Sequence, residues 1–215
     1  MKVKERLQYL RERIPAGVKL VAVSKFHPVE RLMEAYDAGQ RVFGENRPQE
    51  FAAKVPQMPS DVEWHFIGHL QTNKLKLVLP YAHLVQSVDS LHLLEAINTW
   101  CAANGKVVSV LLELHLGAEE TKHGFTEEEL LSLQPSRHTA VRICGLMGMA
   151  TNTEDEAVIE KDFERIEALF RRLQNKFDSS FTELSIGMSG DWPLAVRHGA
   201  TIVRIGTDIF GPREY

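Results

Sequence analysis

The chain is poor in cysteine and shows no export signal. Cys101 and Cys144 are the only two cysteines among 215 residues, and neither belongs to a CxxC pattern. Two isolated thiols cannot supply the disulfide framework of a small secreted domain. Residues 1–6 also lack the apolar core of a signal peptide. We therefore expect a protein of the reducing cytoplasm.

Long apolar runs and basic runs are missing as well. No apolar stretch approaches the roughly 18 residues that a membrane-spanning helix needs. The net charge is -4, and no cluster of lysines and arginines offers a surface for a phosphate backbone. We therefore expect neither a membrane nor a nucleic acid as partner.

The histidines show no metal-binding spacing. His65 and His69 are four residues apart, but residues 64–68 have the apolar character of a strand. In a strand, that spacing does not place two ligands on one helical face. The local spacing therefore predicts no metal site.

What the chain does contain is a regular alternation of short apolar runs and amphipathic segments. An amphipathic helix is predicted at the start, because Val3, Leu7, Leu10 and Ile14 repeat with helical spacing. The predicted strands are 19–25, 41–46, 63–68, 84–88, 107–116, 142–149, 182–185 and 201–205. Two capping boxes, Thr126 with Glu129 and Thr153 with Glu156, mark helix starts late in the chain.

This alternation predicts the fold. Eight strands, each but the last followed by a helix, favour a single (β/α)8 barrel of the TIM type over residues 1–215, with an extra N-terminal helix. An open doubly wound sheet is the alternative. It is disfavoured because no GxGxxG motif follows any strand.

Polar residues gather where the predicted strands end, which is where barrels of this type carry their active sites. Lys25 closes the first strand, and Pro28 behind it suits the first position of a helix. Further along the chain, these positions are Glu45, Asn46, His69, Glu113, His115, Met147, Ser185, Ser189, Arg204, Gly206 and Thr207.

The last two strand ends predict a phosphate site. Barrels often bind phosphate in the loops after strands seven and eight, beside the N-terminus of a short helix. Ser189 and Gly190 lead into such a helix near Asp191, while Gly206 and Thr207 follow the eighth strand. The alternative is that these glycines form ordinary strand-to-helix turns.

Lys25 and Arg204 restrict the classes of ligand that the predicted site could bind. A lysine in a partly dry site can attack a carbonyl as the free amine, although a lysine at a strand end can also simply extend into solvent. Together with a phosphate site, it indicates a Schiff base with a sugar phosphate or with pyridoxal 5′-phosphate (PLP). An inward-facing Arg204 needs an acceptor, either a pyridine nitrogen or a carboxylate such as Glu45 or Glu113.

The motifs taken together resemble the YggS/PROSC family of PLP-binding proteins. The resemblance runs from about Val21 to Arg213, and its most specific stretch is HFIGHLQTNK at 65–74. The other matching motifs are VAVSK at 21–25, FGEN at 43–46, GLMGM at 145–149, LSIGMS at 184–189 and VRIGT at 203–207. Two departures are visible: Ile186 stands where methionine is common, and Arg47 where an aromatic or aliphatic residue is usual.

The resemblance implies a barrel like the N-terminal domain of alanine racemase, with PLP held on Lys25 as a Schiff base. By position, it assigns the phosphate to Ser189, Gly206 and Thr207, the pyridine nitrogen to Arg204, the neighbourhood of the ring to Asn46, and the ring face to Met147 and Met188. The two methionines can equally be core residues.

The resemblance also implies a role in intracellular PLP (vitamin B6) and amino-acid homeostasis rather than a defined reaction. We therefore expect little or no turnover and no catalytic residues, although whether the protein is an enzyme stays open. We expect a monomer, with apo forms of PLP-dependent enzymes as candidate partners. The alternatives are an amino-acid racemase and a Schiff-base aldolase. In alanine racemase a tyrosine from a C-terminal domain serves the second cofactor face, and we expect no such domain here.

Overall fold

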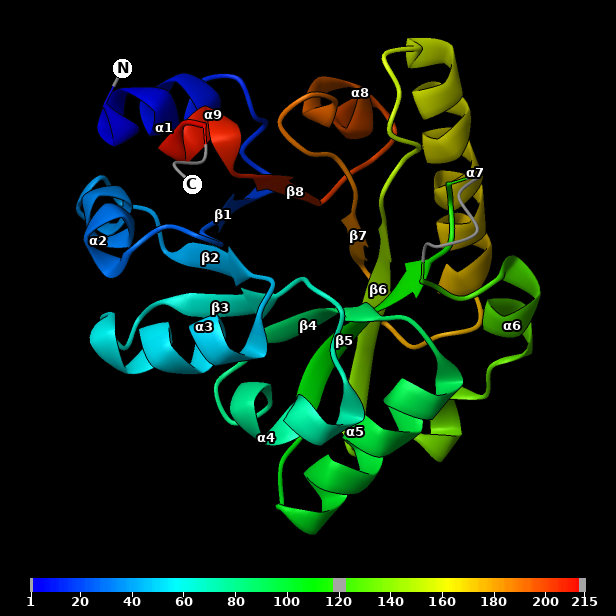
Figure 1. Ribbon diagram of the computed structural model, residues 1–215. Coiled ribbons are helices and arrows are strands. Elements are labelled where there is room, and N and C mark those ends of the chain that lie inside the picture. The colour runs from blue at the N-terminus through cyan, green and yellow to red at the C-terminus, as the bar shows by residue number, and fades with distance from the viewer. Residues whose placement is uncertain (1, 118–122, 213–215) are drawn as a thin grey trace.

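The computed structural model describes residues 2–117 and 123–212. Eight parallel strands close into a barrel in the order β1 to β8, and β8 pairs back with β1 (Figure 1). The strands are β1 (Lys19–Val23), β2 (Val42–Glu45), β3 (Glu63–Phe66), β4 (Leu84–Val88), β5 (Val108–Leu114), β6 (Val141–Gly148), β7 (Glu183–Ser185) and β8 (Ile202–Ile205). The predicted (β/α)8 barrel is therefore confirmed.

Helices surround the barrel in the alternating order that the sequence predicts (Figure 1). They are α1 (Val3–Arg11), α2 (Val29–Asp37), α3 (Pro48–Lys54), α4 (Leu75–Val78), α5 (Leu91–Ala103), α6 (Glu127–Ser132), α7 (Glu156–Gln174), α8 (Trp192–Arg197) and α9 (Thr207–Phe210). Short 3-10 turns lie at η1 (Val55–Gln57), η2 (Thr72–Lys74) and η3 (Pro135–Arg137). The early helix α1 is the predicted additional one, whereas α9 after β8 is an element that the sequence did not predict.

The strands bury both faces because their side chains alternate between two cores. On β5, Leu112 and Leu114 face the large outer core between sheet and helices, while Leu111 and Glu113 face the barrel interior. The apolar layer of that interior is formed by Val21, Leu84, Leu111, Met147 and Ile202. The buried polar and charged residues of the strands include His65, Gln86, Glu113, Ser185 and Arg204.

The start of α7 differs from the prediction. The helix begins after Asp155, whose carboxylate accepts a hydrogen bond from the Ala157 N–H at 3.0 Å. The expected capping box of Thr153 with Glu156 is therefore wrong. Thr153 instead accepts from the Asp155 N–H at 3.1 Å, which fixes the turn before the helix. The box of Thr126 with Glu129 at α6 is confirmed.

The end of β1 is also shorter than predicted. The strand stops at Val23, and Lys25 lies in the following turn rather than closing the strand. Phe26 adopts a left-handed conformation with φ of 67°, which ends the extended chain. Pro28 is the N-cap of α2 rather than its first residue.

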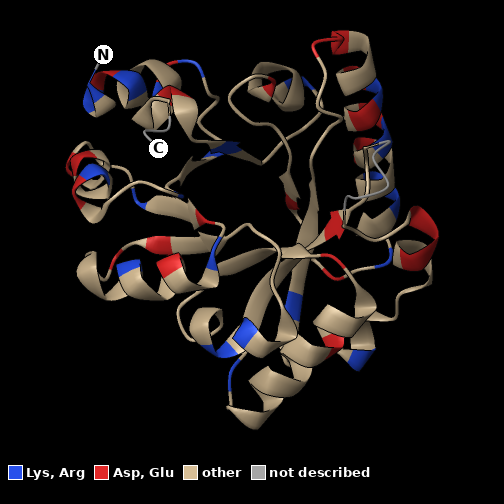
Figure 2. Ribbon diagram, viewed as in Figure 1, with Lys and Arg blue, Asp and Glu red and all other residues tan. Residues whose placement is uncertain are grey.

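Charged residues of both signs lie mainly on the surrounding helices and on loops, and the strands are largely uncharged (Figure 2). Among the described residues, no helix is both long and apolar enough to cross a membrane. The charged groups inside the barrel are therefore few, and they define the site described next.

Candidate functional site

The structure places all of the predicted site residues at one end of the barrel. We call this end the C-terminal rim, meaning the last two residues of each strand and the loop that follows it. Four neighbouring strands, β7, β8, β1 and β2, carry them in an unbroken arc. Met188 and Ser189 follow β7, Arg204 lies in β8, Gly206 and Thr207 follow β8, Lys25 follows β1, and Asn46 follows β2.

Arg204 is a buried cation at the centre of this arc. Its Nη1 donates to the backbone oxygen and the Oγ of Ser185 at 2.7 and 2.6 Å, and its Nη2 donates to the Gly148 oxygen at 2.9 Å. Burial lowers the pKa of the Arg204 guanidinium to about 10, although the negative charges of Glu113 and Asp191 act to raise it. The guanidinium therefore stays charged at neutral pH and retains donor capacity for a ligand.

Of the two carboxylates considered as partners for Arg204, neither forms a close ion pair with it. Glu45 binds Lys54, with 2.6 Å between Nζ and Oε1. Glu113 acts on Arg204 through its charge and raises the pKa of the guanidinium. The close contacts of Arg204 within the described chain are instead Ser185 and Gly148.

A hydrogen-bonded chain of buried side chains crosses the barrel and holds Arg204. His65 on β3 contacts Gln86 on β4 at 2.8 Å, and the Ser185 Oγ donates to the Gln86 Oε1 at 2.6 Å. Burial, then the charges of Lys19 and His83, lower the pKa of His65 well below its usual value, so this imidazole is neutral. The part that His65 and Gln86 play in holding Arg204 was not predicted. The sequence signal for it is a polar residue at an inward-facing position on each of two adjacent strands.

The turn that carries Lys25 is held from both sides by a buried charge cluster. Lys54 donates to the Ser24 backbone oxygen at 3.0 Å, and the Phe26 N–H donates to Glu50 at 3.1 Å. Lys54 also binds the fully buried Glu45 at 2.6 Å and Glu50 at 3.2 Å. These bonds flank Lys25 in the sequence and therefore fix the backbone that presents it.

The pKa values within this cluster follow from burial and partners. Burial raises the pKa of Glu45, and the Lys54 ammonium opposes that change. Burial also raises the pKa of Glu50, but the hydrogen bonds from the Phe26 N–H and Lys54 outweigh it and leave a net lowering. Glu50 is therefore the firmly ionised carboxylate beside the turn.

Asn46 sits where β2 and β3 come unusually close. A Cβ added to Gly68 would lie 2.1 Å from the Asn46 backbone oxygen, so only glycine fits there. The side-chain Oδ1 of Asn46 is buried, and no donor reaches it from the described chain. Because buried polar atoms are nearly always paired, this oxygen is an unsatisfied acceptor, and its contact with a cofactor stays a prediction.

The loops after β7 and β8 expose backbone N–H groups. Within the described residues, the N–H groups of Ser189, Gly190, Gly206 and Thr207 have no acceptor. Gly187 makes the first of these turns possible: its φ is +92°, and an added Cβ would lie 2.6 Å from the Ala195 Cβ. Unpaired N–H groups on adjacent loops are donors of the kind that bind anions, and the phosphate site stays a prediction.

The two methionines expected at the ring face are placed differently. Met188 is 40% exposed and lines a cleft of about 380 Å³ between the loops after β6 and β7. Its N–H donates to the Asp191 carboxylate at 2.5 Å. Met147 is buried in the apolar layer of the barrel interior and is therefore a core residue, which was the alternative prediction for it.

Glu113 is the second ionisable group inside the barrel. It is 7% exposed, and burial raises its pKa from 4.5 to about 7, assisted by the negative charge of Asp89 and opposed by Arg204. The native protein therefore binds the Glu113 proton more tightly than the unfolded chain does. This proton contributes stability below about pH 4.5, which is lost as the pH rises to about 7.

We expect Glu113→Gln to remove this pH dependence. The free energy of unfolding of the wild type minus that of the variant should fall by up to about 3 kcal/mol between pH 4.5 and 7. Urea denaturation of both proteins in chelator, without added ligand, measures this difference. A constant or rising difference across that range would show that Glu113 titrates normally.

Comparison with known proteins places this barrel in a family. Residues 1–214 match the family model described as alanine racemase, N-terminal domain. The alanine racemase of Streptomyces coelicolor aligns with a TM-score of 0.72 at 21% identity, over 97% of this chain and 57% of that one, a likeness of fold alone.

Two relatives are more similar. The pyridoxal phosphate homeostasis protein of Aquifex aeolicus is 39% identical over 220 residues, which cover 100% of this chain and 96% of the relative. PipY of Synechococcus elongatus, solved without PLP, is 38% identical with a TM-score of 0.91, over 98% of this chain and 100% of that one. PipY has also been solved with PLP bound, and that structure aligns with a TM-score of 0.88. The chain therefore belongs to the alanine racemase N-terminal-domain family and, within it, to the pyridoxal phosphate homeostasis proteins.

Proposed function

We propose that this protein binds PLP as a Schiff base on Lys25 and acts in PLP homeostasis, as a carrier or buffer of the cofactor. The observation that carries the proposal is the arc from β7 to β2. It holds an amine on a fixed turn, a buried guanidinium and four unpaired backbone N–H groups on adjacent strand ends. PLP carries an aldehyde, a ring nitrogen and a phosphate, and each has a matching group on this arc.

Each residue has a distinct role in this proposal. Lys25 forms the covalent bond, and the N–H groups of Ser189, Gly206 and Thr207 hold the phosphate. Asn46 lies beside the ring, where its unpaired Oδ1 accepts a hydrogen bond. Met188 borders the site from the loop after β7. When bound, PLP supplies an aldehyde for reversible exchange with amines.

Arg204 is proposed to face the pyridine nitrogen. A charged guanidinium opposes a second positive charge on its neighbour, so the ring nitrogen stays unprotonated. An unprotonated ring is a weaker electron sink, which suits a carrier better than an enzyme. A crystal structure of the loaded protein with a carboxylate at the ring nitrogen would rule out this role.

The proposed function is tested by loading the purified protein with PLP and recording its visible absorption. A Schiff base is yellow and bleaches on borohydride reduction, whereas a Schiff-base aldolase acting on a sugar phosphate is colourless. Equilibrium dialysis should show one PLP per chain. A colourless protein that retains no PLP after dialysis would reject the proposal.

The oligomeric state, the compartment and the partners of the protein are part of the same proposal. We propose a monomer that acts in the cytoplasm, where isolated thiols such as Cys101 and Cys144 stay reduced. Apo forms of PLP-dependent enzymes are its proposed partners. Light scattering of the loaded protein tests the monomer, and transfer of PLP to an apo enzyme faster than its release into buffer tests the partnership.

We expect little or no racemase turnover. Racemisation needs proton donors and acceptors on both faces of the cofactor, and Lys25 can serve only one. No tyrosine among the described residues follows the carboxyl end of a strand: Tyr9 is in α1, Tyr36 in α2 and Tyr81 in the loop before β4. Tyr215 lies outside the described residues.

The measurement is formation of the D-isomer from L-alanine and other amino acids by the loaded protein. Turnover of about one per second or faster, which lies in the ordinary range of enzymes, would contradict the carrier assignment if Lys25→Ala abolished it.

A further inference from the structure

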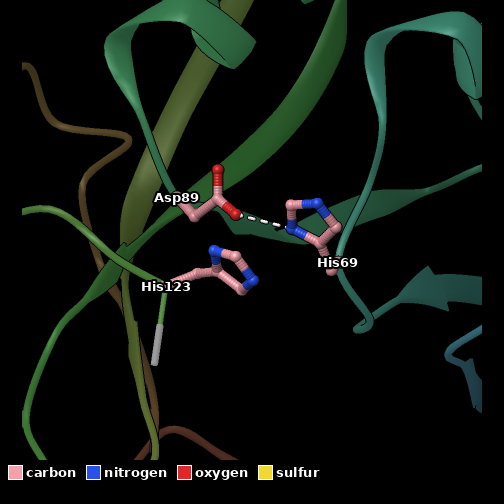
Figure 3. Close-up of side chains that lie close together, drawn as sticks. All are labelled: His69, Asp89 and His123. Atoms are coloured by element: carbon pink, nitrogen blue, oxygen red, sulfur yellow. Dashed lines mark hydrogen bonds and ion pairs between the residues drawn. The ribbon is translucent and has the colours of Figure 1, made fainter. Parts of the chain in front are cut away.

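Three side chains that could hold a metal ion meet on the part of the C-terminal rim that the PLP arc does not use. His69 follows β3, Asp89 directly follows β4, and His123 follows β5 (Figure 3). Their ligand atoms all lie within 4.8 Å of one another. Two residues after His123, Phe125 pairs with the end of β5, and its N–H donates to the Glu113 backbone oxygen at 2.7 Å.

The carboxylate at the centre of this group is buried and already bound to one imidazole. The Asp89 side chain is 7% exposed, and its Oδ2 lies 2.8 Å from the His69 Nδ1 (Figure 3). Its other oxygen accepts from the Ser90 Oγ at 3.1 Å. This second contact orients the carboxylate, as hydrogen bonds to metal-binding carboxylates do. The proton between His69 and Asp89 occupies a position that a cation can take.

The two imidazoles lie on the open side of the carboxylate. The rings of His69 and His123 are stacked, with 4.3 Å between their centroids and 19° between their planes. A tetrahedral ion with bonds of about 2.0–2.2 Å holds its ligand atoms about 3.3–3.6 Å apart. Binding therefore needs the rings to turn out of the stack. The His69 Nδ1 and the Asp89 Oδ2, now 2.8 Å apart, must then separate by about half an ångström to admit the ion, and any pair near the 4.8 Å limit must approach. Both histidines are exposed to solvent.

We propose that His69, Asp89 and His123 bind a divalent transition-metal ion of the zinc type. Two imidazoles and one carboxylate suit Zn²⁺ or Co²⁺, whereas Mg²⁺ and Ca²⁺ prefer oxygen ligands throughout. Three protein ligands leave a fourth position for water or another small ligand. The site is independent of Lys25 and of the proposed PLP function.

The spacing of residues along the chain did not predict this site. The ligands come from three separate strand ends, 20 and 34 residues apart, and only closure of the barrel brings them together. The local spacing pairs His69 with His65, but His65 is buried and belongs to the hydrogen-bonded chain that holds Arg204.

The test is calorimetric titration of the chelator-treated, full-length protein with Zn²⁺ and with Co²⁺, in the absence of PLP. We expect one ion per chain and, for Co²⁺, the visible absorption of a tetrahedral site. His69→Asn and His123→Asn should each weaken binding by at least about tenfold. The control His83→Asn changes a histidine directly before β4, at the opposite end of the barrel from Asp89, and should bind as the wild type does.

Two further measurements make the result decisive. Circular dichroism establishes that the variants fold, and the same concentration of Zn²⁺ should raise the melting temperature of the wild type more than that of His123→Asn. Lys25→Ala should retain the metal site, so failure of the PLP proposal leaves this test intact. Absence of binding by the wild type, or equal affinity of His69→Asn, His123→Asn and His83→Asn, would overturn the proposal.

Discussion

Borohydride reduction of the PLP-loaded protein is expected to fix the pyridoxyl group on Lys25. Lys25→Ala should lose the yellow absorption entirely, because the aldehyde then has no amine on the fixed turn between Ser24 and Phe26. PLP should still bind through its phosphate, with an affinity lower by about two orders of magnitude, or about 2.7 kcal/mol. Peptide mapping by mass spectrometry and equilibrium dialysis measure the two effects.

Other lysines supply the controls for this experiment. Lys74 lies in the turn η2 on the same rim, and Lys74→Ala should keep both colour and affinity. Lys122, which lies outside the described residues, is a second control. An adduct found mainly on Lys74 or Lys122 would show that Lys25 is not the PLP-binding residue.

Lys54→Met is expected to cost about 3–5 kcal/mol of stability at neutral pH, because it leaves the Glu45 carboxylate buried without its cation. The variant also removes the bond to the Ser24 oxygen, one of the two that flank Lys25. We therefore expect weaker PLP binding in whatever fraction stays folded. Urea denaturation gives the first quantity and PLP titration the second.

Two further variants show whether the loss of stability comes from the unpaired charge of Glu45 or from the change in packing. Lys54→Met combined with Glu45→Gln should recover most of the lost stability, because no buried charge is then left alone. Lys161→Met replaces an exposed lysine on α7 and should have almost no effect. If the double variant were as unstable as Lys54→Met alone, the orphaned charge of Glu45 would not be the cause.

The sequence predicted the barrel because the information for it is local. Apolar alternation, strand length and helix spacing set each element, and the short strands such as β4 had clear boundaries. Errors occurred where competing local signals were close in energy. At the start of α7, for example, both Thr153 and Asp155 are good caps, and only the geometry of the loop selects Asp155.

The candidate site was predictable only in part. Lys25, Arg204 and the loops after β7 and β8 are on the rim as expected, because strand ends in a barrel are fixed by topology. The partners of buried charges were not predictable: Glu45 was considered for Arg204, but Lys54 on α3 binds it. A helix residue that reaches under a loop leaves no periodic signal in the sequence.

The chain of side chains from His65 to Arg204 has a consequence for how the barrel opens. It joins β3 and β4 to β7 and β8 across the interior, so the two walls cannot separate without breaking the contact between Ser185 and Gln86. The amide hydrogens of all four strands should thus exchange with solvent as one cooperative unit. A ligand that tightens Arg204 would then slow exchange on the far wall as much as on its own.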